Sequence, residues 1–278
     1  MYISDSFPVS PRISPNASPR LALLADAILL GGAKARSSLR RRLDSELIAK
    51  APRDYQTEMD IAVEQIIVDA VSRSFPSYAI KGEEAVGNRT AENGAPIIYI
   101  DPIDGTTNFA WGIPHFGMTI SIVEDGQVVA GVVYDAMLDE LFSAESGGGA
   151  YLNGEQVRCV SSGSVENALV GAGLPIPGQL KAVQEEVYFA ALKRLMATTA
   201  GVRRLGSAAL SIAYVACGRL DGFFEDGLSL HDYGASALLV REAGGIVSAF
   251  NGGPVTETGD ILAATAFLHS WLVEGFQV

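Results

Sequence analysis

The sequence has few cysteines, no long apolar run and a shortage of basic residues. Only Cys159 and Cys217 occur in 278 residues, which excludes a disulfide scaffold or a thiolate metal centre and favours a reducing, cytoplasmic setting. Charges and glycines interrupt every apolar stretch well before the roughly 20 residues that a membrane-spanning helix needs, so we expect no membrane partner. Twenty Lys and Arg face 32 Asp and Glu. The resulting charge of −12 disfavours nucleic acid as a partner and favours divalent cations.

The first residues of the chain differ in composition from the rest. Residues 1–19 carry Ser and Pro repeatedly and offer no packed face, which predicts a mobile N-terminal arm. The apolar run after Arg20 imitates a signal peptide, but Asp26 interrupts it and its helical spacing continues past the imitated cleavage site. We therefore expect one folded domain over residues 20–278, beginning with a helix over residues 21–43.

The two halves of this domain show different patterns. In residues 20–162, the apolar runs 116–123 and 128–134 flank a Gly-containing turn, which predicts an antiparallel hairpin. In residues 163–278, short strands alternate with helical stretches such as 181–196, as layered α/β structure requires. The sequence predicts an α/β fold with a mostly antiparallel N-terminal sheet and a smaller C-terminal α/β half.

The most informative stretch is Asp-Pro-Ile-Asp-Gly-Thr-Thr-Asn-Phe at residues 101–109, directly after the apolar run 96–100. This pattern predicts a buried strand that presents acids at its C-terminal end. Gly105 permits a sharp turn, so Asp101 and Asp104 can face one cation, and the following N–H groups form an anion site if they open a helix. Hard oxygen ligands beside a phosphate cradle predict a magnesium-dependent phosphoryl site. An Asx turn explains each residue singly, but not the concentration of acids after a strand.

Other acids have plain structural alternatives. Asp60 stands three residues after Thr57, a capping-box spacing, and Asp232 stands just before an apolar-periodic helix. Glu83 and Glu84 lie in a polar connection, where a Glu pair is usually solvated charge. Helix capping and catalysis are geometrically compatible for Asp60 and Asp232.

Three segments together resemble the signatures of the inositol monophosphatase family: residues 82–84, residues 101–109 and residues 231–235. Their order and spacing also match, so the resemblance covers roughly residues 20–278. It implies the αβαβα sandwich of the sugar phosphatases, a homodimer, and a magnesium-dependent phosphatase of the lithium-sensitive type.

The resemblance also implies a role for each site residue and two or three Mg²⁺ ions. The metal ligands would be Glu83, Asp101, Ile103 through its carbonyl, Asp104 and Asp232. Asp60 and Thr106, with Glu83, would activate a metal-bound water for in-line attack on a phosphate monoester. The substrate would contact Asp104, Gly105, Thr106, Thr107, Gly206, Ser207, Ala208, Glu225 and Asp232.

The substrate stays open at this point. Glu225 can accept hydrogen bonds from vicinal hydroxyls, which makes inositol 1-phosphate the leading small phosphorylated metabolite. It can equally meet the ammonium of histidinol phosphate, and 3′-phosphoadenosine 5′-phosphate and fructose 1,6-bisphosphate are further alternatives. The segment before Asp60 departs from the family pattern, so the basic residue over the site is not assigned between Lys50 and Arg53. A non-catalytic regulatory scaffold is the alternative from another class, although a degenerate scaffold has no chemical need for five intact carboxylates.

Overall fold

The computed structural model describes residues 11–39, 48–51, 54–92, 94–175 and 178–277. The helices within these ranges are α1 (Pro19–Ser38), α2 (Glu58–Ser74), α3 (Thr106–Ala110), α4 (Glu185–Thr198), α5 (Ala208–Ala216), α6 (Leu230–Glu242) and α7 (Ala266–Glu274). A short antiparallel pair, β1 (Ile48–Ala51) and β2 (Asp54–Gln56), lies outside the two main sheets.

The large sheet comes from the N-terminal half and is ordered along the chain. Its strands are β3 (Ala79–Gly82), β4 (Ile97–Asp104), β5 (Gly117–Glu124), β6 (Gln127–Asp135), β7 (Glu140–Glu145), β8 (Gly149–Leu152) and β9 (Glu155–Val157). Only β3 and β4 run parallel, and every other neighbouring pair is antiparallel. The predicted hairpin corresponds to β5 and β6.

The small sheet comes from the C-terminal half and has crossovers. Its strands, in spatial order, are β11 (Gly201–Arg203), β10 (Leu169–Ala172), β12 (Gly222–Glu225), β14 (Ile261–Ala264) and β13 (Ile246–Ser248). The first three are mutually parallel, whereas β14 is antiparallel to both of its neighbours.

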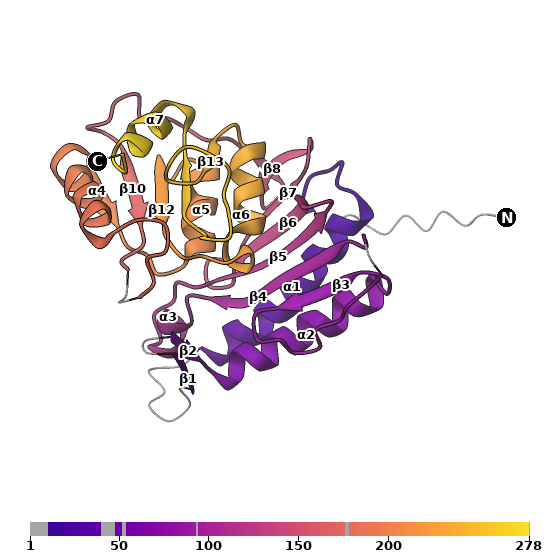
Figure 1. The fold of residues 1–278 in the computed structure, drawn as a ribbon. Coiled ribbons are helices and arrows are strands. Elements are labelled where there is room, and N and C mark those ends of the chain that lie inside the picture. The colour runs from indigo at the N-terminus through magenta and orange to yellow at the C-terminus, as the bar shows by residue number, and fades with distance from the viewer. Residues whose placement is uncertain (1–10, 40–47, 52–53, 93, 176–177, 278) are drawn as a thin grey trace.

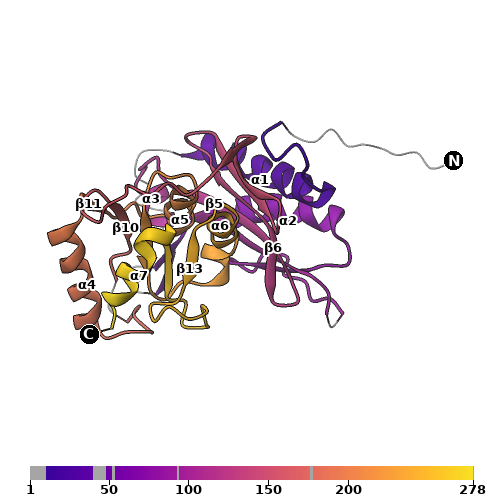
Figure 2. The ribbon, with the colours of Figure 1, turned by 90° about the horizontal axis from the view of Figure 1, so that it is seen from above.

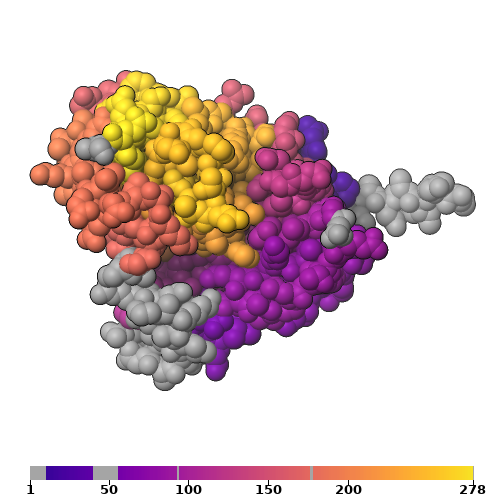
Figure 3. All heavy atoms as spheres, viewed as in Figure 1, coloured from indigo at the N-terminus to yellow at the C-terminus, as the bar shows by residue number. Residues whose placement is uncertain are grey.

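Helices and sheets alternate in five layers (Figures 1 and 2). Helices α1 and α2 cover one face of the large sheet, α5 and α6 lie between the sheets, and α4 and α7 cover the outer face of the small sheet. The space-filling view shows the two halves lying directly against each other (Figure 3). The predicted αβαβα sandwich, with its mostly antiparallel N-terminal sheet, is confirmed.

The layering explains why the strands of the large sheet do not alternate between apolar and polar residues. Strand β5 is buried at seven of its eight positions, because helices cover both of its faces. Met118, Ile120 and Ile122 belong to the core under α1 and α2, while the Thr119 hydroxyl on the opposite face donates to the His231 carbonyl at 3.3 Å. Strand β6 contributes to two cores at once, since Val132 lies in the core under α1 and α2 and Val133 lies in the core on the opposite face.

Helix α6 touches the large sheet at the level of the backbone. A Cβ atom added at Gly131 on β6 would lie 2.8 Å from the Ala235 Cα, and one added at Gly234 would lie 2.9 Å from the Ser121 hydroxyl. Contacts below 3.0 Å between a Cβ and such atoms do not occur in folded proteins. Small residues on both sides thus let α6, which carries Asp232, lie directly on the sheet.

The prediction of a mobile arm over residues 1–19 was wrong for residues 11–18, which pack against the large sheet. Ile13 is buried, and the Arg12 guanidinium donates to the side chains of Asp139 and Asn153, both at 2.9 Å. These contacts join segments more than 120 residues apart, so local composition carried no sign of them. Residues 1–10 lie outside the described residues.

The helix predicted over residues 21–43 starts slightly earlier, because Ser18 caps it and Pro19 occupies its first position. It ends at Ser38, and residues 40–47 lie outside the described residues. No helix among the described residues has the length and hydropathy needed to cross a membrane.

Substitution of Gly131 by Ala tests the contact of α6 with the sheet. We expect the free energy of unfolding to fall by about 1–3 kcal/mol, because the new methyl group forces α6 away from β6. Chemical denaturation measures this, with Gly253→Ala as the matched control, since its Cβ would meet only the end of the Asn251 side chain. Equal stability of the two variants would contradict a backbone-level contact.

Candidate active site

The end of β4 departs from regular strand geometry at Asp101 and Asp104. These are the two acids of residues 101–109, called the core motif below. Asp101 pairs with Thr119, but Asp104 pairs with Gly117, so three steps on β4 match two on β5. Such a bulge redirects side chains, and Pro102 within it has no N–H to lose from the ladder. The Ile103 N–H donates to Asp101 Oδ1 at 3.0 Å. The bulge lets both acids face the same side of the strand end.

Three carboxylates meet at this point. Asp101, Asp104 and Asp232 each offer one ligand oxygen, and these oxygens all lie within 4.8 Å of one another. Within the described part of the chain, none of the three forms an ion pair with Lys or Arg. Asp101 is buried, and Asp104 and Asp232 are half-buried. Carboxylate oxygens without a protein cation are hard ligands of the kind that Mg²⁺ prefers, so these residues fit a divalent metal ion.

Asp104 is fixed by the N-terminus of α5. Its Oδ2 accepts hydrogen bonds from the Ser207 hydroxyl and from the Ala209 N–H, the latter at 2.7 Å. Ser207 is also the N-cap of α5 and accepts from the Leu210 N–H at 3.2 Å. The predicted substrate contact Ser207 therefore has its hydroxyl engaged in positioning Asp104.

Asp60 and Asp232 both cap helices and both reach the site. Asp232 Oδ2 accepts from the Ser229 N–H at 2.6 Å in the capping box of α6. Asp60 Oδ2 accepts from the Thr57 N–H at 2.8 Å in the capping box of α2, while its Oδ1 accepts from the Thr106 hydroxyl at 3.1 Å. The two oxygens of Asp60 thus separate the structural role from the contact with Thr106.

Glu83 lies beside this cluster but is not among its three closest carboxylates. The side chain is exposed, and its N–H donates to the Ile100 carbonyl of β4 at 2.9 Å. A hydrogen bond between Glu83 and Asp101, together with the repulsion of their charges, helps to raise the pKa of Asp101. Glu83 therefore reaches the cluster from the side of Asp101.

The turn after Asp104 is restricted to glycine. Gly105 has φ +99°, and a Cβ there would lie 2.8 Å from the carbonyl oxygen of Gly206. Gly105 is the N-cap of α3, whose first residues are Thr106 and Thr107. The first N–H groups of a helix have no partner within the helix, and those of α3 follow Asp104 and Gly105 directly in the chain.

Asn108 was not singled out by the sequence, although it lies inside the core motif. It is 7% exposed, and its amide donates to the carbonyls of His115 and Leu205 at 2.7 and 2.8 Å. Asn108 thereby ties the core motif to the segment that begins at Leu205. Only its position in a motif otherwise full of oxygen ligands could have drawn attention to it.

A cavity of about 90 Å³ adjoins Asp104 and contains most of the predicted substrate contacts. It is lined by Asp104, Ala172, Gly173, Arg204, Leu205, Gly206, Ser207, Ala208, Ser211, Phe223, Glu225 and Leu228. Glu225 accepts a weak hydrogen bond from the Gln179 amide at 3.5 Å. Four predicted substrate contacts do not line this cavity: Gly105, Thr106, Thr107 and Asp232. Thr107 is an exposed residue of α3.

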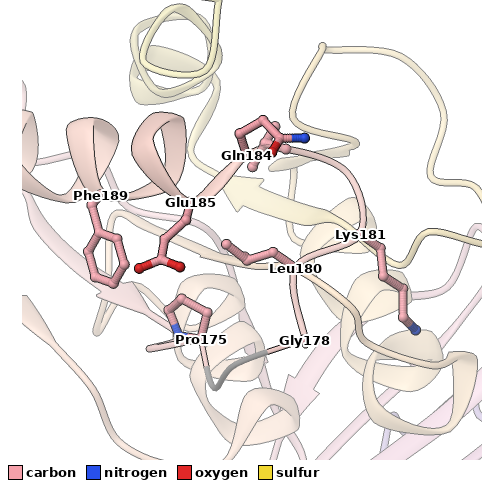
Figure 4. Close-up of a pocket in the computed structure, with 8 residues that line it drawn as sticks. Pro175, Gly178, Leu180, Lys181, Gln184, Glu185 and Phe189 are labelled. Atoms are coloured by element: carbon pink, nitrogen blue, oxygen red, sulfur yellow. The ribbon is translucent and has the colours of Figure 1, made fainter.

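A larger cavity of about 230 Å³ lies in front of α4 (Figure 4). Its walls are Pro175, Gly178, Leu180, Lys181, Val183, Gln184, Glu185 and Phe189. Glu185 is its only carboxylate and stands in the first turn of α4. None of the predicted site residues lines this cavity, so it has no part in the candidate active site.

Burial and mutual repulsion raise the pKa values across the site. Burial raises the pKa of Asp60 to about 6, and burial with the nearby Asp232 raises that of Asp104 to about 7. Burial, then Asp104 and Asp232, raise the pKa of Glu225 to about 8. Burial and the charges of three neighbouring acids raise the pKa of Asp101. The cluster resists full ionisation unless a cation joins it.

Residues 17–277 match the model of the inositol monophosphatase family. The chain belongs to the inositol monophosphatase family. The inositol-1-monophosphatase of Mesorhizobium japonicum is 40% identical over 81% of this chain and 84% of its own length. The Nus factor SuhB of Pseudomonas aeruginosa is 44% identical over 77% of this chain and 79% of its own length.

Solved structures agree with this family assignment. The extragenic suppressor protein suhB of Bartonella henselae superposes with a TM-score of 0.88 at 34% identity, covering 94% of this chain and 99% of its own. Inositol monophosphatase from Anabaena gives a TM-score of 0.80 at 32% identity, covering 93% and 95%. As a member of the inositol monophosphatase family, the chain is assigned to the phosphoric monoester hydrolases.

The raised pKa values predict an unusual dependence of stability on pH. An acid with a raised folded-state pKa binds more protons folded than unfolded, so stability is lost as pH rises from the ordinary value of 3.8 through the folded value. Without metal, we expect the melting temperature to fall from about pH 4 to about pH 8, the range between the ordinary and the folded pKa values of these acids. With Mg²⁺ present, the fall should shrink, because the cation offsets the repulsion.

Differential scanning calorimetry in EDTA and in Mg²⁺ measures this effect. Asp104→Asn serves as the control, because removing one acid with a pKa of about 7 should flatten the fall in EDTA. A melting temperature that rises with pH in EDTA would contradict the proposed electrostatics.

Proposed function

We propose that this protein hydrolyses a small phosphate monoester in a Mg²⁺-dependent reaction, with inositol 1-phosphate as its substrate. The observation that carries the proposal is the meeting of Asp101, Asp104 and Asp232 beside the N-terminus of α3. Glu83 and the Ile103 carbonyl would complete the metal shell. When bound, Mg²⁺ ions lower the pKa of water and stabilise the oxygen that leaves.

Thr106 and Asp60 would orient the attacking water and accept its proton. The Thr106 hydroxyl can donate to Asp60 Oδ1 at 3.1 Å or to the Ile103 carbonyl at 3.0 Å. Its own oxygen lone pairs then remain to accept a hydrogen bond from water. A pKa of about 6 leaves Asp60 mostly ionised at neutral pH. Because this pKa lies close to the pH at which the enzyme would work, Asp60 can serve as a general base.

The phosphate would lie over the N-terminus of α3, and the leaving group would enter the cavity next to Asp104. Glu225 and Arg204 both line this cavity, and the positive charge of Arg204 opposes the rise in the pKa of Glu225. Cations bound at Asp104 and Asp232 would offset the charges that help to raise the pKa of Glu225. The hydroxyls of a polyol can then donate hydrogen bonds to the Glu225 carboxylate and accept hydrogen bonds from the guanidinium. Relatives named inositol-1-monophosphatase, at 40% and 36% identity, support this substrate.

A regulatory role without catalysis is the second candidate, because other relatives carry the name Nus factor SuhB. The complete set of carboxylates favours catalysis, since a binding protein has no use for three mutually repelling acids of which one is buried and two are half-buried. The charge of −12 also disfavours direct contact with nucleic acid. We propose a cytoplasmic homodimer that acts on a small phosphorylated metabolite, without a membrane partner.

Asp104→Asn separates the two candidates. We expect turnover to fall about a hundredfold or more, because one anionic ligand is lost from a site that supplies several kcal/mol of transition-state stabilisation. Phosphate release in a Mg²⁺ titration measures this. Asp125→Asn is the matched control, since Asp125 is exposed in the β5–β6 turn with φ +49°, which Asn tolerates. A variant as active as the control would refute a catalytic role for the cluster.

A panel of phosphate esters tests the substrate. We expect the highest kcat/KM with inositol 1-phosphate, and lower values with histidinol phosphate, fructose 1,6-bisphosphate and 3′-phosphoadenosine 5′-phosphate. Glu225→Gln should lower kcat/KM about tenfold for inositol 1-phosphate, because the amide accepts fewer hydroxyl protons. If histidinol phosphate proves the better substrate and loses more on this substitution, Glu225 recognises an ammonium group instead.

A further inference from the structure

Helix α2 carries a second buried acid one turn after Asp60. Glu64 is 0% exposed, and its spacing of four residues places it on the same helix face as Asp60. Both of its oxygens accept backbone hydrogen bonds from one loop. Oε2 accepts from the Glu84 N–H at 2.8 Å, and Oε1 accepts from the Val86 N–H at 2.7 Å.

This loop follows Glu83, a proposed metal ligand, and has an unfavourable backbone shape of its own. Ala85, which lies between the two donors, has φ +58°, a left-handed conformation that costs free energy for any residue with a Cβ. The two bonds to Glu64 hold the N–H groups on either side of Ala85 on one carboxylate. Without that carboxylate, we expect Ala85 to leave the left-handed region and the loop to change its conformation.

The two hydrogen bonds from the loop to Glu64 are called the clamp below. The loop lies close against α2 on both sides of this clamp. A Cβ at Gly82 would lie 2.2 Å from Glu64 Oε1, and one at Gly87 would lie 2.8 Å from Val68 Cγ1. Glu64 and Val68 are again one turn apart on α2. The loop therefore follows one row of α2 side chains, and glycines stand where this row comes too near for any side chain.

We infer that Glu64 is a positioning residue for the metal site, which acts by clamping the loop that carries Glu83. Glu83 is held at its own N–H by the Ile100 carbonyl at 2.9 Å, and on its C-terminal side by the clamp. Glu64 touches neither metal nor substrate and acts through the backbone of Glu84 and Val86. This inference rests on the proposed function, in which Glu83 binds the ion that it shares with Asp101.

The chain contains a matched clamp away from the site. Glu242 on α6 accepts from the N–H groups of Gly147 and Gly149, both at 2.8 Å. It likewise holds the first and third residues of a tight loop through two carboxylate oxygens. None of the proposed site residues lies in that loop, so Glu242 controls for the loss of a loop clamp as such.

The test compares Mn²⁺ binding to the wild type, Glu64→Gln and Glu242→Gln by isothermal titration calorimetry in the absence of substrate. The side-chain amide of Gln has only one oxygen, so it cannot accept from both N–H groups as the carboxylate does. We therefore expect the dissociation constant of Mn²⁺ from Glu64→Gln to rise about tenfold or more. Glu242→Gln should bind as the wild type does. Turnover of Glu64→Gln should approach that of the wild type once Mg²⁺ is saturating, whereas its Mg²⁺ midpoint rises.

The outcomes distinguish this inference from the proposed function. If both Glu→Gln variants lose thermal stability and bind Mn²⁺ as the wild type does, Glu64 is only structural and the inference is overturned. If the wild type itself binds no Mn²⁺, the proposed metal site fails, and the inference with it.

Two further measurements keep the inference testable if Glu64→Gln does not fold. Gly82→Ala places a methyl group against Glu64 while α2 keeps its sequence, and it should weaken Mn²⁺ binding in the same direction. In the wild type, hydrogen exchange should show slow exchange of the Glu84 and Val86 amides despite their place in a loop. Fast exchange of both amides would show that the clamp does not exist in solution.

Discussion

The site depends on holding several like charges together in a buried corner, and helix N-termini make this possible. Asp60, Asp104 and Asp232 each use one oxygen to accept N–H groups at the start of α2, α5 and α6 respectively. Such N–H groups carry partial positive charge. Asp104 and Asp232 are each fixed by one oxygen and take part in the carboxylate cluster, whereas Asp60 uses its other oxygen to accept from the Thr106 hydroxyl. Capping and ligation are two uses of the same side chain.

This double use explains how two different predictions for Asp60 both correspond to contacts in the structure. The spacing of Thr57 with Asp60 indicated a cap, and the resemblance indicated a pairing with Thr106; the structure contains both contacts, on different oxygens. The acids after the apolar run of β4 were equally visible, because a strand that ends in charge is a local pattern. Local strand and helix periodicities indicated an antiparallel N-terminal half and an α/β C-terminal half, whereas the αβαβα layering was implied by the resemblance to the family.

The residues that the sequence did not reveal act between segments. Asn108 joins carbonyls 7 and 97 residues away, and Glu64 holds N–H groups 20 and 22 residues away. Both satisfy backbone groups that folding would otherwise leave buried without partners. These hydrogen bonds form only once the fold brings the segments together, so neither periodicity nor composition predicts them. The packing of Arg12 against Asp139 was missed for the same reason.

The contact between Gly131 and Ala235 has a further consequence for how the two halves are spaced. Side chains in a core can change rotamer and so absorb small shifts between layers, but two backbones in contact have no such adjustable material between them. The distance between strand β6 and helix α6 is therefore fixed at this contact. Because α6 also carries Asp232, this contact sets how closely that acid can approach the sheet that carries Asp101 and Asp104.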